Sequence, residues 1–285
     1  MKLGYHVSIQ GGVDKAVDRA VELGCDTFQI FTRNPRSWKT RDLDDAEVEA
    51  FRRKRRDARL DPVFDHMPYI LNLASPEEGV YRRSVESLAE GVRRCSVLGI
   101  PMLVTHIGSH LGAGGGVPRV VAALREALGD GSKVTILLEN GSGSKNGVGS
   151  RLEEVGEILD GVDKCEQLGV CLDTCHAFAA GYDLGMRDGL WETLDALDSS
   201  VGFARLGLVH LNDSVGGLGS GVDRHEHIGL GQIGLEGFRV ILGSPLADVP
   251  MVMETPLDER RGDGENLVLV REILASLGHD EDSGL

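Results

Sequence analysis

Histidines and carboxylates follow short apolar runs at several points of this sequence, most clearly in the segment 170–176. This segment reads Val-Cys-Leu-Asp-Thr-Cys-His, and its apolar start is typical of a buried strand. Asp173 and His176 follow where that strand should end. A carboxylate and an imidazole in this position can bind a metal ion, but Asp173 could equally cap a helix while His176 packs in the core. The repetition of the pattern elsewhere favours the metal site.

Six consecutive predicted strands end in such residues. The candidate ligands are, in chain order, His66, His106, Glu139, Asp173, His176, His210, Asp223, His225 and Glu254. The carboxyl ends of parallel strands meet at one rim of a barrel, so these side chains should converge there. They exceed the four ligands of one tetrahedral zinc and suit two or three ions, with a carboxylate bridging a pair. Asp223 and His225 could share an ion, although His227 continues their two-residue spacing and is not excluded by it.

The elements that must position these residues alternate between short β-type runs and longer amphipathic stretches. The predicted strands are residues 2–7, 27–31, 62–65, 101–105, 134–138, 169–172, 207–211 and 249–253. The predicted helices are residues 13–23, 45–59, 77–98, 117–128, 152–159, 190–197, 236–242 and 265–277. Eight alternating units predict an α/β fold, a parallel eight-stranded (β/α)8 TIM barrel with its site at the C-terminal face. We expect one domain over residues 1–277 and a disordered acidic tail over 278–285.

The composition argues against a membrane protein, a disulfide-rich protein and, by charge alone, a nucleic-acid-binding protein. The chain has 285 residues, of which 41% are hydrophobic, enough for one sizeable core. It has neither a long apolar stretch nor an apolar leader, so we expect a cytoplasmic monomer without a membrane partner. The cysteine count of five is odd, which argues against a disulfide framework. The net charge of −15 argues, by itself, against nucleic acid, and the basic run 52–56 is best interpreted as a solvated helix face.

Several longer motifs resemble those of the endonuclease IV family, the zinc-dependent apurinic/apyrimidinic endonucleases. Segment 170–183 is similar to the central signature of the family, segments 210–214 and 223–231 to a second motif, and segment 66–74 to a third. Segments 4–8 and 138–140 also match. The resemblance covers nearly the whole chain and implies a repair enzyme whose partner is double-stranded DNA with abasic sites.

The resemblance implies three Zn²⁺ ions per chain. The first would be held by His66, His106 and Glu139, the second by Glu139, Asp173, His210 and Glu254, and the third by His176, Asp223 and His225. The family thus selects His225 over His227. Its reaction hydrolyses the phosphodiester 5′ to an abasic site, giving a 3′-hydroxyl and a 5′-deoxyribose phosphate. A hydroxide bridging the first two ions would be the nucleophile, with Glu139 and Glu254 as the catalytic carboxylates.

DNA contacts are expected from loops around the barrel mouth. Arg36, Tyr69 and Ile70 match the residues that the family inserts into the duplex, although Tyr69 and Ile70 could also be ordinary packing residues. Further phosphate contacts could come from Arg33, Lys39, Arg41 and Lys145. The sequence departs from the family at Val215, where Lys or Arg is usual, and this departure removes a plausible phosphate contact.

Two other functions remain open from the sequence. A TIM-barrel sugar isomerase or epimerase also places His, Glu and Asp at the rim, around a single divalent ion. It would not need the additional group of His176, Asp223 and His225. A non-catalytic binder of damaged DNA on the same barrel is the third hypothesis. His6, on the first predicted strand, is interpreted as a core histidine or as one that supports a ligand.

Overall fold

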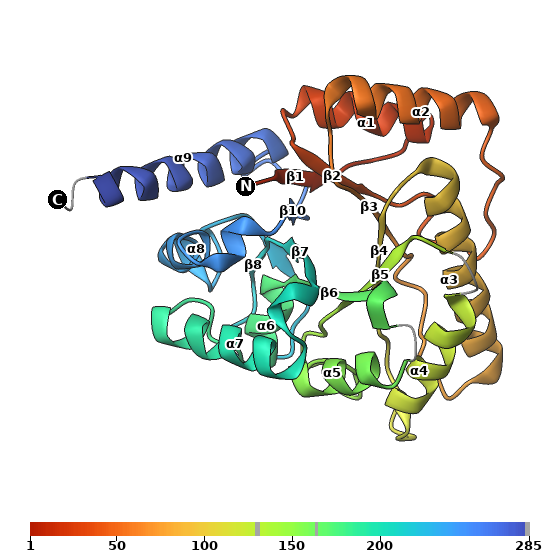
Figure 1. The fold of residues 1–285 in the computed structure, drawn as a ribbon. Helices are drawn as coiled ribbons and strands as arrows, with labels where there is room; N and C mark the ends of the chain where they lie inside the picture. Colours follow the sequence, from red (N-terminus) through yellow and green to blue (C-terminus); the bar gives the residue numbers. More distant parts are fainter. Residues whose placement is uncertain (129–131, 163–164, 283–285) are drawn as a thin grey trace.

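Eight parallel strands close into a barrel, and helices surround it (Figure 1). The computed structural model describes residues 1–128, 132–162 and 165–282. The barrel strands are β1 (Leu3–His6), β2 (Thr27–Ile30), β3 (Val63–His66), β4 (Met102–His106), β5 (Thr135–Glu139), β6 (Leu168–Asp173), β7 (Leu206–His210) and β10 (Met251–Met253). They are hydrogen-bonded in the order β1-β10-β7-β6-β5-β4-β3-β2, and every pair is parallel. The predicted (β/α)8 barrel is therefore confirmed, and each predicted strand overlaps an observed one.

Helices follow the barrel strands in the chain, and α9 comes after the last strand. They are α1 (Val13–Glu22), α2 (Asp45–Ala58), α3 (Glu78–Leu98), α4 (Gly116–Ala127), α5 (Leu152–Asp160), α6 (Thr174–Ala180), α7 (Arg187–Ser200), α8 (Gly234–Leu242) and α9 (Asp263–Asp282). Short 3₁₀ turns, η1 (Cys165–Gln167), η2 (Phe203–Arg205) and η3 (Pro245–Asp248), precede β6, β7 and β10. The basic run 52–56 lies within α2, where Arg52, Arg53 and Arg56 are exposed, as expected of a solvated helix face.

Three features differ from the sequence prediction. Helix α6 was not predicted and begins directly after β6. A small antiparallel hairpin, β8 (Asp213–Ser214) with β9 (His225–Glu226), forms in the loop after β7. Helix α9 continues through Asp282, so most of the segment 278–285 is helical rather than a disordered tail, and residues 283–285 lie outside the described part of the chain. The apolar periodicity that we used fades before this helix ends, because a helix needs an apolar face only where it packs on the barrel.

A cluster of six side chains, the interior layer, packs inside the barrel. Its members, each at most 1% exposed, are Phe64, Val104, Leu137, Cys171, Leu208 and Val252. A much larger apolar core lies between the strands and the surrounding helices. The interior leaves little spare room, since a Cβ at Gly169 or at Gly207 would lie 2.8 Å from a methyl group of Leu137. Among the described residues, no helix combines the length and apolar character needed to cross a membrane.

Truncation of this interior layer should destabilise the protein strongly. Leu137→Ala removes a 1%-exposed side chain from the barrel centre and should lower the free energy of unfolding by about 2–5 kcal/mol. Leu257→Ala is the matched control, because Leu257 is 85% exposed and its truncation should change that free energy by less than about 0.5 kcal/mol. Urea unfolding followed by circular dichroism measures both. Equal destabilisation by the two variants would contradict the assigned interior.

Candidate metal centre

The barrel presents six acidic or imidazole side chains directly above its interior layer. Side chains two residues apart on a strand point to the same side, and each interior residue is followed two positions later by a candidate ligand. These ligands are His66, His106, Glu139, Asp173, His210 and Glu254. Strand register aligns two pairs of them across neighbouring strands, His106 with Glu139 and Asp173 with His210. The alternation of side chains along each strand therefore positions both the interior residue and the candidate ligand two positions later.

Glu139 lies at the centre of this rim and is buried. Its Oε2 is 3.1 Å from Nε2 of His66 and 3.4 Å from Nε2 of His106. Its Oε1 is 3.0 Å from Nδ1 of His210 and 3.4 Å from Nδ1 of His176. The two oxygens of one carboxylate thus face different sets of imidazoles, which is the arrangement that a bridging ligand requires.

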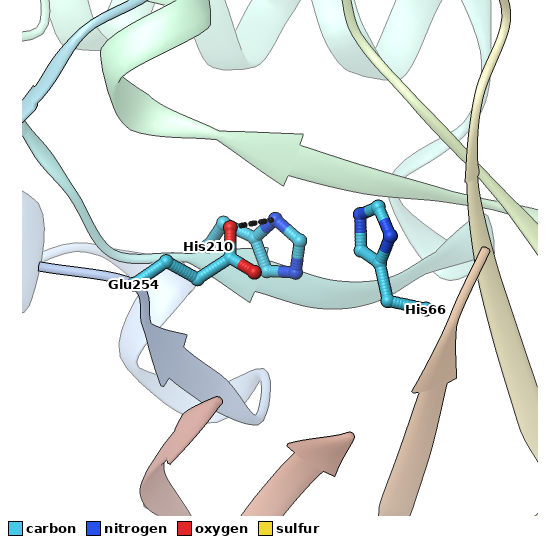
Figure 2. A group of neighbouring side chains, drawn as sticks. All are labelled: His66, His210 and Glu254. Carbon is cyan, nitrogen blue, oxygen red and sulfur yellow. Dashed lines mark ion pairs between the residues drawn. The ribbon is translucent and has the colours of Figure 1, made fainter. Parts of the chain in front are cut away.

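Two groups of possible ligand atoms share Glu139. His66 and His106 form the first with it, and Asp173, His210 and Glu254 form the second, with all the ligand atoms of each group within 4.8 Å of one another. Nδ1 of His210 is 3.4 Å from Oε2 of Glu254 and 3.8 Å from Oδ2 of Asp173. Figure 2 shows the Glu254 carboxylate against the His210 ring, with the His66 ring facing this pair. These three residues also form a separate group of possible ligands for one metal ion.

The third group depends on segments beyond the strands. His176 lies on α6, Asp223 in the loop after β7 and His225 at the start of β9, and their ligand atoms lie within 4.8 Å of one another. Nε2 of His176 is 3.0 Å from Oδ1 of Asp223, and Nε2 of His225 is 3.9 Å from the same oxygen. Cys175 forms an alternative group with Asp173 and His225, but burial raises the pKa of its thiol to about 12, so the thiolate form is disfavoured.

Asp173 is both a helix N-cap and a candidate metal ligand, the two possibilities that its position in the sequence allowed. It is the N-cap of α6, and its Oδ1 accepts a hydrogen bond of 2.7 Å from the backbone N–H of His176. Its Oδ2 accepts a bond of 2.8 Å from the side chain of Asn212 and also faces His225 at 3.5 Å. One carboxylate therefore starts the helix that carries His176 and joins the second ligand group.

The structure separates His225 from His227. Nε2 of His225 faces the carboxylates of Asp173 and Asp223. His227 is fully buried away from them, with Nε2 3.1 Å from Asp258 and Nδ1 accepting from Asn266 at 3.0 Å. Only His225 is therefore available to the third group, in agreement with the family pattern.

The outer ring nitrogens of four of these histidines are fixed by protein acceptors. With the inner nitrogen unprotonated, the outer N–H donates in each case: His66 to the carbonyl of Met67 at 2.6 Å, His176 to that of Asn140 at 3.1 Å, His225 to that of Glu254 at 3.1 Å, and His210 to the side-chain oxygen of Gln29 at 2.9 Å. The inner nitrogens are then free lone-pair donors pointed at the carboxylates. Histidine ligands of metals are characteristically held in this way.

The site fits bound metal. Nε2 of His225 is buried and has no hydrogen-bond partner among the described residues, although it faces two carboxylates. Imidazole nitrogens and carboxylate oxygens are the ligands that zinc and similar ions take. Buried carboxylates this close together also need compensating positive charge. Cations between these groups would satisfy both the unpartnered nitrogen and the excess of negative charge.

When no metal ion is present, protons on the histidines can compensate part of the negative charge of these carboxylates. Burial alone would lower the pKa of His176, but the carboxylates of Asp173, Asp223 and Glu139 outweigh it and raise this pKa to about 10. Burial also opposes protonation of His66 and His210. Glu139 nevertheless raises the pKa of His66, and Cys171, Glu254 and Glu139 raise that of His210. The pKa of Glu139 lies well below its ordinary value despite burial, because imidazoles surround it.

The expected DNA contacts are only partly exposed. Arg36 and Tyr69 are exposed, come from the loops after β2 and β3, and touch through a hydrogen bond of 3.3 Å from Nε of Arg36 to the Tyr69 hydroxyl; Ile70 beside them is half-buried. Arg33 was wrongly expected at the surface. It is 5% exposed, and its guanidinium donates to the carbonyl of Trp38 and the hydroxyl of Ser87, so it supports the loop from inside.

Two grooves flank the centre. One of about 370 Å³ is lined by His106, Glu139, His176 and Asp223 together with Tyr69 and Ile70 and the glycine-rich loops after β4 and β5. The other, of about 820 Å³, lies between the loops after β1, β2 and β10 and includes Arg36 and Lys39. Tyr69 and Ile70 therefore line the groove that reaches the candidate ligands, whereas Arg36 and Lys39 line the second groove, which contains none of these ligands.

Three buried amides at the site were missed by reasoning from the sequence. Gln29 contacts His210 and Glu254, Asn140 accepts from the backbone of Asp173, and Asn212 donates to the Asp173 carboxylate. Each carries no charge and follows none of the spacings used above. A signal did exist for Gln29, because it is a lone amide within the otherwise apolar run Phe-Gln-Ile-Phe.

Fold and site together define a TIM-barrel protein with several buried groups of histidines and carboxylates that could hold metal ions. A family described as xylose isomerase-like TIM barrel matches residues 17–276. The chain is 53% identical over 276 residues to the probable endonuclease 4 of Methanoculleus marisnigri, covering 95% of this chain and 98% of that protein. It also resembles the crystal structure of endonuclease IV from Thermus thermophilus, with a TM-score of 0.84 and 40% identity over 98% of this chain and 100% of that one. The chain belongs to the endonuclease IV family of AP-site DNA-repair endonucleases, as its motifs predicted, and this family implies bound metal.

The sugar-epimerase hypothesis finds support only in the fold. A D-tagatose 3-epimerase-like protein matches with a TM-score of 0.74 over 99% of this chain and 100% of that one, but at 20% identity. Barrels of this kind host many reactions, so the likeness shows the architecture and not the chemistry.

The stability of metal-free protein should depend on pH through His176. Its pKa is raised from 6.5 to about 10, so its stabilising contribution is complete below pH 6.5 and is lost as the pH rises through about 10. The free energy of unfolding of chelator-treated protein should therefore fall across that interval. Urea unfolding at several pH values measures it, and His176→Gln should give a flatter curve. An equally steep curve for this variant would contradict the assignment.

Proposed function

We propose that this protein hydrolyses the phosphodiester 5′ to an abasic site in double-stranded DNA, and that three Zn²⁺ ions per chain take part. The first ion would be held by His66, His106 and Glu139, the second by Glu139, Asp173, His210 and Glu254, and the third by His176, Asp223 and His225. The products would be a 3′-hydroxyl and a 5′-deoxyribose phosphate. The observation that carries the proposal is the buried Glu139 carboxylate, with four imidazoles within 3.4 Å of its two oxygens.

Bound zinc would lower the pKa of water towards about 7 and stabilise negative charge on the phosphate and on the leaving oxygen. The chain itself holds and orients the groups around that chemistry. Glu139 joins the first two ligand groups, so its carboxylate sets their separation. The third group stands beside them on α6 and the β8–β9 hairpin, which supports a role at the leaving 3′-oxygen.

Glu254 is placed to handle a proton. Its Oε1 is engaged by the side chains of His6 at 2.9 Å and Gln29 at 2.8 Å. Its Oε2 faces the ligand groups and lies 3.4 Å from Nδ1 of His210. An anchored Oε1 orients Oε2 towards the centre, where Oε2 would accept a hydrogen bond from the attacking water.

The loops at the mouth would receive the duplex. Overall negative charge repels DNA, so attraction must come from local cations: the bound metal and exposed basic side chains such as Arg36 and Lys39. Tyr69 is 55% exposed at the rim of the groove that leads to His106 and Glu139. An aromatic ring in this place can stack into the gap that an extruded abasic nucleotide leaves.

The runner-up, a single-metal sugar isomerase or epimerase, leaves part of this site without a purpose. One divalent ion would be saturated by the strand-end ligands. The His176, Asp223 and His225 group, with the unpartnered nitrogen of His225, would then have no function. This group favours the nuclease.

Loss of the bridging carboxylate should abolish cleavage. Glu139→Gln removes the charge between the first two ligand groups and should lower the rate of nicking of a duplex with one abasic site by at least about 100-fold. It should also reduce bound zinc, measured by elemental analysis. The control Glu157→Gln, on the exposed face of α5, should match the wild type in both assays. Wild-type protein that binds three zincs but leaves the abasic duplex intact would overturn the proposed reaction.

Removal of the exposed ring should weaken DNA binding without affecting the metal. Tyr69→Ala deletes a stacking group worth about 1–3 kcal/mol, so the Kd for abasic duplex should rise by about 5–150-fold at unchanged zinc content. Tyr69→Phe keeps the ring and loses only the hydrogen bond from Arg36, so it should bind nearly as well as the wild type. Fluorescence anisotropy at fixed salt measures both, and equal affinity of the alanine variant would show that Tyr69 is not a stacking residue.

A further inference from the structure

Gln29 is a fully buried amide beneath the candidate metal centre. It lies on β2, in register with His6 on one side and with the interior residue Phe64 on the other. An amide replaces an apolar side chain at this level of the barrel. Burying such a group is costly unless its hydrogen bonds are satisfied, so its partners indicate why it is there.

Every polar atom of this amide has a partner in the site. Its Nε2 donates to Oε1 of Glu254 at 2.8 Å and lies 2.9 Å from Nδ1 of His6. Its Oε1 accepts from Nε2 of His210 at 2.9 Å. One rigid planar group therefore connects two residues of the second ligand group, on the side facing away from the proposed ions.

The charge of Glu254 determines which way the amide faces. A carboxylate accepts hydrogen bonds and repels another oxygen, so the NH₂ end of Gln29 must point to Glu254. The carbonyl end then points to His210, and it can only accept. Nε2 of His210 must therefore carry the ring proton, which leaves Nδ1 with a free lone pair.

The reversed amide would block the site. It would place NH₂ against Nε2 of His210, move the ring proton to Nδ1 and direct an N–H at the centre. Nδ1 is the atom 3.0 Å from Glu139 and 3.4 Å from Glu254, where a metal would be bound. A protonated Nδ1 cannot donate a lone pair to a metal.

We propose that Gln29 is a positioning residue that uses the negative charge of Glu254 to fix the tautomer of His210 and so keeps Nδ1 of His210 available to a metal ion. This proposal rests on the proposed metal centre but not on the reaction catalysed there. The same amide restrains Oε1 of Glu254, so it orients two ligands of one ion with a single side chain. Metal affinity, rather than the fold, is the property that it controls.

The test uses Gln29→Met, which keeps length and volume but removes both hydrogen bonds. Zn²⁺ affinity of the full-length protein is measured by competition with a chelator. It should fall by about 10–100-fold, the range seen when an outer partner of a metal-binding histidine is lost. The matched control is Gln167→Met, which deletes the 2.6 Å hydrogen bond that Nε2 of Gln167 donates to the Ser132 carbonyl at the opposite end of the barrel. It should leave zinc affinity unchanged.

A second measurement needs no variant. In zinc-loaded wild-type protein labelled with ¹⁵N-histidine, NMR should find the His210 proton on Nε2 and none on Nδ1. Zinc affinity of Gln29→Met within twofold of the wild type, or a wild-type His210 protonated at Nδ1, would overturn the proposal. Failure to nick abasic DNA would instead count against the proposed reaction, because neither readout here depends on activity.

Discussion

The buried carboxylate of Glu139 holds the candidate metal centre together. Four imidazoles approach its two oxygens, and three further carboxylates belong to the groups around it. Several carboxylates buried this close together are stable only when nearby positive charge compensates their negative charge. The raised pKa of His176 favours a protonated ring that supplies part of that charge in the metal-free protein, and bound cations would replace the proton. The clustered carboxylates that destabilise the metal-free fold are the same groups that would attract metal ions.

The barrel makes this arrangement rigid. Six ligands stand two residues above six packed interior side chains, so each is anchored by a neighbour on its own strand. Less regular segments add the remainder: α6 provides His176, and the β8–β9 hairpin provides His225 beside Asp223. Asp173 links the two systems because it both ends a strand and caps α6. Loops can thus extend the strand-built site without loosening it.

Neutral amides complete the centre. Asn140 accepts a hydrogen bond from the backbone of Asp173, Asn212 donates one to its carboxylate, and Gln29 connects His210 with Glu254. These contacts hold the backbone or the side chain of a candidate ligand in place. The likeness to epimerase barrels at 20% identity shows how far one scaffold can be reused, whereas the additional third ligand group distinguishes this site. Function here is decided by which side chains stand on the rim and how they are held.

The barrel and six of the candidate ligands could be predicted from the sequence, because alternation along strands and the shared rim of parallel strands are local, periodic properties. The sequence left open whether Asp173 bound metal or capped a helix, and the structure places it both at the N-cap of α6 and among the residues that could hold a metal ion. The folded chain was needed to separate His225 from His227, to place Arg33 inside and to bring Gln29 beneath His210. Loop conformation and contacts between distant strands decide these features. Neither produces a periodic pattern of residues that can be recognised in the sequence. For the same reason, the loss of apolar pattern near 278 did not mark the end of α9.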